Sequence, residues 1–379
     1  MMKQKVGILT TYFASNFGAM LQPFALKRHI EQLGYDVEMI RYKQPLIERY
    51  YNPWKLFIFK TLNPLTIASY LLHLPEMLVR DYAFKQFMYK HINSERGYCK
   101  TLPKDKDFYF IGSDQIWNPR HTGGFDDIYF GKFDVKKGSI KASYAASAEN
   151  IDYTNQQVSY LKINIKNFDY VSVREVELEN NIRNVTGRPD ICTVLDPTML
   201  VDPKVYDEIK CQHPCIGEKF IFFYDIRNCK KFADRILDHA KSINARLVIV
   251  SEMPDKWYKQ FAKKHKEVIY APCAGIEFFL GGMKYAEFIY TASFHGTVFA
   301  ILNHKKFHTL NLRDDKMTRP LHLLSMLGLS NRLLALEDNI SEEEIDYSNV
   351  DKLLDEQRVF SRSFVLKVLN ANAQLKNNL

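Results

Sequence analysis

Residues 5–40 read KVGILTTYFASNFGAMLQPFALKRHIEQLGYDVEMI, and this stretch decides the fold class. Residues 5–10 are a short apolar run, which is typical of a buried strand. Residues 17–33 have helical spacing of apolar side chains, and Gly34 follows as a stop signal. Residues 37–40 predict a second strand. The order strand, helix, strand predicts a parallel sheet with right-handed crossovers.

The same alternation returns after a long insertion at residues 44–100. Further strands are predicted at 108–111, 142–145, 170–173, 191–195, 220–224, 246–250, 268–270, 288–290 and 307–310. We therefore predict an α/β protein with two doubly wound, Rossmann-like domains that face a cleft. In such a protein ligands bind at the carboxyl ends of the strands.

The points at which the alternation of strands and helices stops and restarts predict four segments. These are an N-terminal domain over 1–202 that contains the insertion, a linker over 203–218, a C-terminal domain over 219–340 and a helical segment over 341–379. The length of 379 residues also favours two domains.

Composition excludes several classes of protein. The chain has 52 Lys and Arg against 44 Asp and Glu, a net charge of +8 without a basic block of the kind that binds nucleic acid. This excess suits an anionic substrate or a membrane surface, and it is also compatible with solubility alone. The first apolar run is too short for a signal peptide, and no run reaches the roughly 18 apolar residues of a membrane span. We expect a cytoplasmic protein.

The six cysteines are scattered, which fits that compartment. Cys211 and Cys215 flank His213, but no second cluster with matching spacing follows. The pattern therefore predicts a loop rather than a metal site.

Two loops after predicted strands of the N-terminal domain carry polar residues. Asn16 lies where a helix begins, so it either caps that helix or faces a ligand. Asp114 follows the strand at 108–111, where a carboxylate can deprotonate a sugar hydroxyl, and Trp117 can stack on a sugar face. The alternative is an Asx-type turn with a core tryptophan, and chemistry alone favours neither.

The stretch at 291–297 places His295 at the mouth of a helix. A histidine there can act as an acid or a base near neutral pH, and the helix dipole favours an anion beside it. The alternative is a buried core histidine. Arg227, Lys316 and Arg319 also follow predicted strands of this domain, so they can complete an anion site if they converge on one cleft.

Together these segments resemble the polysaccharide pyruvyltransferase family. The matching stretches occur in the family's order: GILTTYFASNFGAMLQPFAL, FYFIGSDQIWNP, KASYAAS, VSVRE, VLDPTML, TASFHGTVFAIL and MTRPLHLLSMLGL. The resemblance implies a two-domain fold similar to that of the GT-B glycosyltransferases. It also implies phosphoenolpyruvate as donor and a pyruvate ketal on two hydroxyls of one sugar as product.

The resemblance extends to single residues. His295 matches the family's catalytic histidine, Arg227 a donor-binding arginine, and Lys316 a donor-side lysine of some members. Many members have arginine where this chain has Ser293, so other cations must meet the phosphate charge here. The C-terminal domain is then the donor side and the N-terminal domain the acceptor side.

The sequence patterns and the resemblance together indicate one set of site residues. We expect His295 and Asp114 to be catalytic, Arg227, Ser293, Lys316 and Arg319 to bind the donor, and Asn16, Gln22, Ser113 and Trp117 to bind the acceptor. The chemistry needs an acid, a base and cations for phosphate and carboxylate, so we expect no metal and no cofactor besides the donor substrate.

Two other functions stay open from the sequence. A nucleotide-sugar glycosyltransferase of the same architecture needs a carboxylate that reads the ribose, and Glu277 is an unmarked candidate. A non-catalytic member of the family would only bind a glycan. Since His295 and Arg227 are both present, the sequence favours an enzyme.

The insertion mixes basic and aromatic residues. Arg49, Trp54, Lys55 and Lys60 lie in this part of the chain, and such a surface can adsorb to anionic lipid head groups. A helical subdomain that packs its aromatics inside is the alternative, favoured by the irregular pattern. If the acceptor is a lipid-linked glycan, we expect peripheral contact with the inner membrane face.

Overall fold

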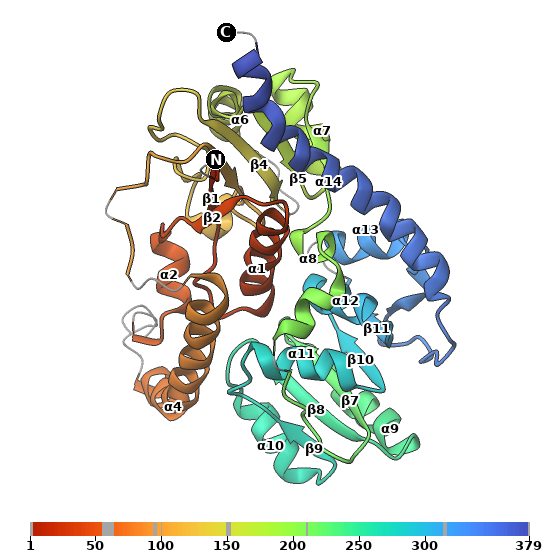
Figure 1. The fold of residues 1–379 in the computed structure, drawn as a ribbon. Helices are drawn as coiled ribbons and strands as arrows, with labels where there is room; N and C mark the ends of the chain where they lie inside the picture. The colour runs from red at the N-terminus through yellow and green to blue at the C-terminus, as the bar shows by residue number, and fades with distance from the viewer. Residues whose placement is uncertain are drawn as a thin grey trace.

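A computed structural model describes residues 3–54, 64–93, 97–99, 101–148, 153–209, 211–313 and 317–377. In this described part, twelve strands form two six-stranded sheets in which every pairing is parallel. We refer to residues up to 209 as the N-terminal half and to residues 211–340 as the C-terminal half. The predicted architecture of two doubly wound, Rossmann-like units is confirmed (Figure 1).

The N-terminal sheet has the strand order β2-β1-β3-β4-β5-β6. Its strands are β1 (Lys5–Leu9), β2 (Asp36–Met39), β3 (Phe108–Ile111), β4 (Ile140–Ala146), β5 (Tyr170–Val173) and β6 (Cys192–Thr193). Its α-helices are α1 (Phe17–Gln32), α2 (Pro45–Tyr51), α4 (Pro64–Phe87), α5 (Pro119–Thr122), α6 (Asn155–Asn164), α7 (Val176–Thr186) and α8 (Pro197–Leu200). The short helix η1 (Met88–Ile92) continues α4, and η2 (Ile165–Asn167) and η3 (Pro203–Glu208) are 3₁₀ turns.

The C-terminal sheet has the order β12-β11-β10-β7-β8-β9. Its strands are β7 (Phe220–Asp225), β8 (Arg246–Ser251), β9 (Val268–Tyr270), β10 (Phe288–Thr291), β11 (Lys306–Leu310) and β12 (Leu333–Leu334). Its α-helices are α9 (Ala233–Ser242), α10 (Lys256–Lys264), α11 (Ile276–Tyr285), α12 (Phe294–Leu302) and α13 (Thr318–Met326), and η4 (Lys230–Phe232) and η6 (Ser330–Arg332) are 3₁₀ turns.

Each strand order reverses at one point. In the N-terminal sheet the chain moves outward in both directions from β1 and β3, and in the C-terminal sheet from β7 and β10. At such a reversal the loops at the carboxyl ends diverge and leave a crevice for a ligand. The topology thus selects four loops as the places where a site can form.

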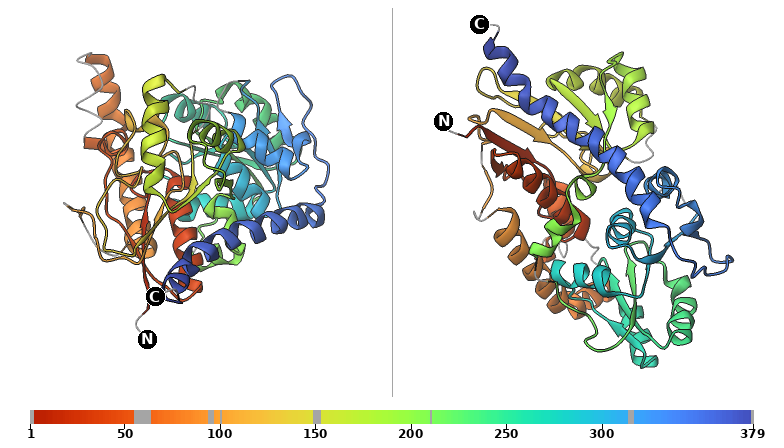
Figure 2. Two further views of the ribbon diagram at one scale, coloured as in Figure 1. Left: turned by 90° about the horizontal axis from the view of Figure 1, so that it is seen from above. Right: turned by 45° about the vertical axis from the view of Figure 1, so that its right-hand side comes forward.

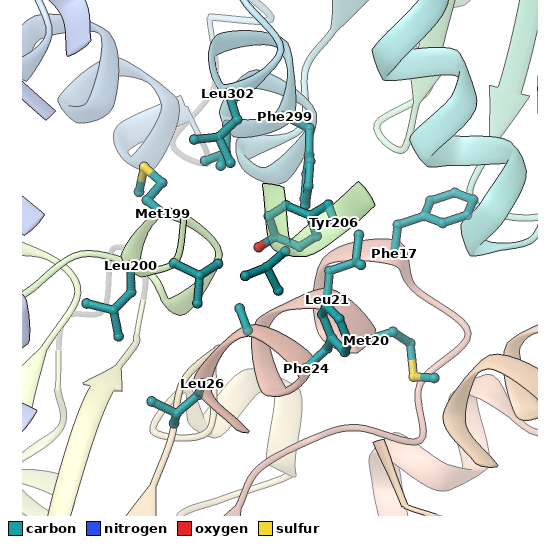
Figure 3. Close-up of a cluster of buried hydrophobic side chains, with 14 of the residues drawn as sticks. Phe17, Met20, Leu21, Phe24, Leu26, Met199, Leu200, Tyr206, Phe299 and Leu302 are labelled. Carbon is teal, nitrogen blue, oxygen red and sulfur yellow. The ribbon is translucent and has the colours of Figure 1, made fainter. Parts of the chain in front are cut away.

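A shared apolar core joins the two halves. Helix α1 has the N-cap Asn16, whose side chain accepts a hydrogen bond from the Ala19 N–H, and it is buried along most of its length. Figure 3 shows side chains of α1 meeting those of α8, η3 and α12. Tyr206 of η3 lies between them, 5.0 Å from the Phe299 ring centroid and 6.1 Å from that of Phe24. This packing holds the carboxyl ends of the two sheets toward each other.

The last helix, α14 (Tyr347–Asn377), crosses both halves (Figure 1). Near its start the Tyr347 hydroxyl donates to the Lys305 carbonyl, and further along the Arg358 and Arg362 guanidinium groups donate to the carbonyls of Met199 and Leu200. It therefore fastens the C-terminal half to the N-terminal half.

Most predicted elements are confirmed within a few residues. The sequence prediction missed β12, and it started the last helix too early, because residues 341–346 are not helical. The insertion is helical in its described part, through α2, α4 and η1.

Candidate active site

A cavity of about 700 Å³ lies between the halves, at the loops that the topology selects. From the N-terminal half it is lined by Thr11, Ala14, Asn16, Ala19, Leu46, Ile47, Arg49, Tyr50, Tyr51, Asp114, Gln115, Arg120 and His121. From the C-terminal half it is lined by Ile226, Arg227, Glu252, Ala292, Ser293, Phe294, His295, Arg319 and Pro320.

His295 occupies the first turn of α12. Ser293 caps this helix, since its hydroxyl oxygen accepts the Gly296 N–H at 3.2 Å. The His295 side chain is 9% exposed, and its ring packs against α1, where a Cβ atom on Gly18 would overlap it. Because Gly18 has no side chain, the His295 ring of the C-terminal half can pack against α1. The partial positive charge of the helix N-terminus makes this place favourable for an anion.

A buried carboxylate lies behind His295. Asp196, the N-cap of α8, has its Oδ2 3.5 Å from Nε2 of His295, within ion-pair reach and longer than a normal hydrogen bond. Burial alone would raise the pKa of Asp196, but the His295 imidazole and the Arg174 guanidinium hold that pKa well below its ordinary value. Asp196 thus stays ionised and can orient the imidazole.

Arg174 connects this carboxylate to Asp114. Its Nη1 donates to Oδ2 of Asp196 at 2.7 Å, and its Nη2 lies 3.7 Å from Oδ1 of Asp114. Burial alone would lower the pKa of Arg174, yet Glu175, Asp196 and Asp114 raise it above its ordinary value. Asp114 lines the cavity, with its side chain 21% exposed. The ion pairs of Arg174 therefore link Asp114 to the carboxylate behind His295.

Four arginines line the cavity, two from each half. Arg227 and Arg319 come from the C-terminal half, while Arg49 on α2 and Arg120 on α5 come from the N-terminal half. The Arg227 N–H donates to Oδ1 of Asp225 at 2.9 Å, which fixes the turn after β7. Lys316, a predicted donor-side lysine, lies outside the described residues.

Glu252 is a second carboxyl group in the cavity. It follows β8, and the Tyr51 hydroxyl of α2 donates to its Oε1 at 3.2 Å. Burial raises the pKa of Glu252, while hydrogen bonds with Tyr51 and Asn16 and the charge of buried Arg80 act in the opposite direction. A carboxyl with a raised pKa can hold or release a proton nearer neutral pH than an ordinary one.

Three predicted acceptor residues do not line the cavity, which corrects the prediction. Trp117 is fully buried: its indole N–H donates to the Tyr129 carbonyl, and its ring stacks on Phe130 at 5.1 Å. It is a core tryptophan and has no face for a sugar. Ser113 and Gln22 are also fully buried. The Ser113 hydroxyl donates to Asp196, and the Gln22 amide bridges the Thr10 hydroxyl and the Ser113 N–H.

The other predicted residues in the described chain converge on the cavity: His295, Asp114, Arg227, Ser293, Arg319 and Asn16. Sequence reasoning assigned no role to Asp196, Arg174 and Glu252. The first two lie in the quoted segments VLDPTML and VSVRE, so their position after predicted strands was an available signal. Glu252 had no comparable signal beyond following the strand at 246–250.

Neither a metal cluster nor a membrane span is visible in the part of the chain that the structure describes. Within it, no three His, Cys, Asp or Glu side chains gather in a way that could hold an ion. None of its helices combines the length and the apolar character needed to cross a bilayer.

Solved structures with similar folds have little sequence in common with this chain. UDP-N-acetylglucosamine 2-epimerase from Rickettsia bellii has a TM-score of 0.51 at 11% identity and covers 100% of this chain and 99% of its own. The UDP-GlcNAc 2-epimerase from Methanocaldococcus jannaschii has a TM-score of 0.49 at 12% identity, covering 93% and 92%. The E. coli heptosyltransferase WaaC with ADP has a TM-score of 0.38 at 9% identity, covering 93% and 100%. Only the first of these TM-scores exceeds 0.5, and at 11% identity that similarity concerns the fold alone.

Sequence comparison is more specific about the family. No curated protein matches the chain. A family model described as polysaccharide pyruvyl transferase matches residues 16–314. This span includes the loops after β3, β7 and β10, and of the loop after β1 only the last residue, Asn16. That span covers well over half of the 379 residues. The chain is a transferase and belongs to the polysaccharide pyruvyl transferase family.

Proposed function

We propose that the protein transfers pyruvate from phosphoenolpyruvate to two hydroxyls of one hexose in a bacterial surface glycan, with a cyclic ketal and phosphate as products. The observation that carries the proposal is the position of His295. His295 lies in the first turn of a helix and has the ionised carboxylate of Asp196 behind its ring. Two arginines line the same wall of the cavity.

The C-terminal wall suits the donor. Phosphoenolpyruvate carries a phosphate and a carboxylate, and both need cations or N–H donors. Arg227, Arg319 and the N-terminus of α12 supply these within one wall. Ser293 serves as the cap of that helix, so it supports the anion site through the backbone.

The residues at the site can perform each proton transfer. In the proposed reaction, the protonated form of His295 gives a proton to the methylene carbon of the donor, which becomes a methyl group. A sugar hydroxyl then adds to the adjacent carbon and loses its proton. The carbon–oxygen bond to phosphate breaks, and the second hydroxyl closes the ring and loses its proton. One of these two protons replaces the one that His295 gave, and the other leaves with phosphate.

Two carboxyl groups are available as bases for the hydroxyls. Asp114 faces the cavity from the N-terminal half and Glu252 from the C-terminal half. Because Arg174 lies between Asp114 and Asp196, a proton on Asp114 changes the field at the carboxylate that orients His295. A positioned acid or base contributes roughly 10²–10⁴-fold to a rate.

In this proposal the acceptor is a cytoplasmic glycan precursor on a lipid carrier, and neither nucleic acid nor a metal takes part. The direct test is calorimetry with phosphoenolpyruvate and with UDP-sugars, followed by phosphate release in the presence of glycan oligosaccharides. We expect binding of phosphoenolpyruvate and acceptor-dependent release of phosphate. Binding of a UDP-sugar with no affinity for phosphoenolpyruvate would establish the glycosyltransferase alternative instead.

A further inference from the structure

Helix α4 exposes an apolar face where a helix on a protein surface normally carries charges. Leu71 is 52% exposed, Leu72 74%, Val79 55% and Tyr82 65%. With 3.6 residues per turn these four positions fall within about 100° of one another around the helix axis, so their side chains lie along one side of the helix. Pro75, at the middle of the same side, is also exposed. The opposite side packs inward through Tyr70, Met77, Arg80, Phe84 and Phe87.

Helix α2 carries further exposed apolar and aromatic side chains. Leu46 is 37% exposed, Tyr50 48% and Trp54, just beyond the helix, 64%, and the three are spaced by four residues. Leu46 and Tyr50 also line the cavity. Figure 2 shows the helices of the insertion (orange) at one edge of the molecule. Both helices of the insertion therefore carry exposed apolar side chains, and those of α2 reach the mouth of the cavity.

The most exposed charged side chains on this surface are basic. Among the described residues between 41 and 93, the exposed charged side chains are Arg49, Lys85 and Lys90, all basic. The carboxylates of Glu48, Glu76 and Asp81 are less exposed and pair with Lys43, Lys259 and Lys85 at 2.6 Å each. The surface thus combines apolar and aromatic side chains with cations and shows no exposed acid in its described part.

We propose that this face of α2 and α4 binds the surface of an anionic membrane. Apolar side chains with Trp, Tyr and basic neighbours are the composition that inserts at the head-group boundary. Anionic lipid attracts the exposed cations, whereas a second copy docked through the same face would bring like charges together. The membrane is therefore the occupant that the charges favour.

The position of the face has a consequence for the substrate. Because Leu46 and Tyr50 belong both to this face and to the cavity, a glycan on a membrane-bound lipid carrier can enter without leaving the surface. This second step rests on the proposed function, while membrane binding itself does not.

Co-sedimentation with vesicles tests the proposal on the full chain. The probe is a vesicle of phosphatidylglycerol and phosphatidylcholine in equal parts, with a pure phosphatidylcholine vesicle as comparison. The test variant carries Leu71→Ser, Leu72→Ser and Val79→Ser. The matched control carries Ile163→Ser, Ile216→Ser and Val359→Ser, whose side chains are 68%, 89% and 69% exposed elsewhere on the molecule. Circular dichroism establishes that both variants are folded.

We expect the unchanged protein and the control to bind the anionic vesicles at low salt and to bind less at high salt. The partition coefficient of the test variant should fall by at least about tenfold. Absence of binding at low salt, or equal binding by both variants, overturns the proposal. A concentration-dependent dimer that only the test variant loses would make a second copy the occupant. Pyruvyl transfer to a water-soluble oligosaccharide should be equal in all three proteins, so a failure there concerns the proposed reaction and leaves the vesicle result intact.

Discussion

The two sheets meet the cavity with loops of the same topology that carry different side chains. In the N-terminal half, the loop after β3 turns Ser113 and Trp117 into the core and leaves one carboxylate, Asp114, facing the cavity. In the C-terminal half, the loops after β7 and β10 leave Arg227 and His295 at the cavity wall. Parallel sheets with a reversal point therefore fix where a site lies, and the residues after the strands decide which partner each wall receives.

The difference also explains why neither half suffices alone. His295 belongs to the C-terminal half, but Asp196, which holds its imidazole, and Gly18, which makes room for its ring, belong to the N-terminal half. The surroundings of His295, our proposed acid, are completed only where the two halves pack together through α1, α8 and α12.

The largest effect should come from the acid itself. We expect His295→Gln to lower kcat by roughly 10²–10⁴-fold, the usual contribution of a positioned proton donor. Donor affinity should change much less, because the arginines and the α12 N-terminus remain. Single-turnover phosphate release and calorimetry separate the two quantities. His322→Gln is the matched control, since that residue does not line the cavity. A kcat unchanged in His295→Gln would remove the histidine from the chemistry.

The carboxylate behind the histidine should have the next largest effect. Asp196→Asn keeps the size of the side chain but removes the charge that orients His295, so we expect kcat to fall by about 10²-fold or less. Asp202→Asn, which alters another N-cap of the same segment, is the control. If Asp196 only supported the structure, its replacement would lower stability and leave the pH dependence of kcat unchanged. If Asp196 positions His295, the replacement also shifts the pH range over which kcat depends on the protonated acid.

The same substitution changes how stability depends on pH. The pKa of Asp196 is depressed in the folded protein, so its contribution is present above its unfolded pKa of about 4 and disappears as the pH falls below that value. Urea unfolding of the unchanged protein and Asp196→Asn should therefore differ at neutral pH and converge in acid. A constant difference across that range would contradict an ionised Asp196.

Most of the fold could be predicted from the sequence, because short apolar runs mark the strands and the helical spacing of apolar residues marks the helices between them. Strand β12, which consists of Leu333 and Leu334 directly after the 3₁₀ turn η6, was missed. Of the residues that the sequence selected for the site, Asp114, Arg227 and His295 line the cavity, whereas Trp117, Ser113 and Gln22 lie in the core. Trp117 and Asp114 lie in one loop, and local sequence cannot tell which of them points into the core.

Contacts between the halves were also beyond local sequence. Asp196 and His295 are separated by about a hundred positions in the chain, and their meeting depends on how α1 and α12 pack. The same holds for Tyr51 and Glu252, which join the insertion to the C-terminal half.

Arg227 and Arg120 test whether the two walls bind different partners. We expect Arg227→Ala to weaken phosphoenolpyruvate binding by roughly 1.5–3 kcal/mol, the scale of a charge-assisted hydrogen bond. Arg120→Ala, on the other wall, should leave donor affinity nearly unchanged. Calorimetry measures both without an acceptor. If the two variants lose affinity equally, the donor spans the cavity and the division between the walls is wrong.

The smallest effect should come from Trp117→Phe, which asks whether the loop after β3 serves the core or the sugar. The phenyl ring can keep the stack on Phe130, but it loses the bond from the indole N–H to the Tyr129 carbonyl, 3.0 Å long in a fully buried place. An unsatisfied buried carbonyl costs about 1–2 kcal/mol, so we expect the free energy of unfolding to fall by that amount. The KM for the acceptor should not change, because no part of Trp117 reaches the cavity. Chemical denaturation and acceptor kinetics on the same preparation measure both. A raised KM with unchanged stability would mean that Trp117 contacts the sugar after all, and the N-terminal wall would then need a rearranged loop to receive it.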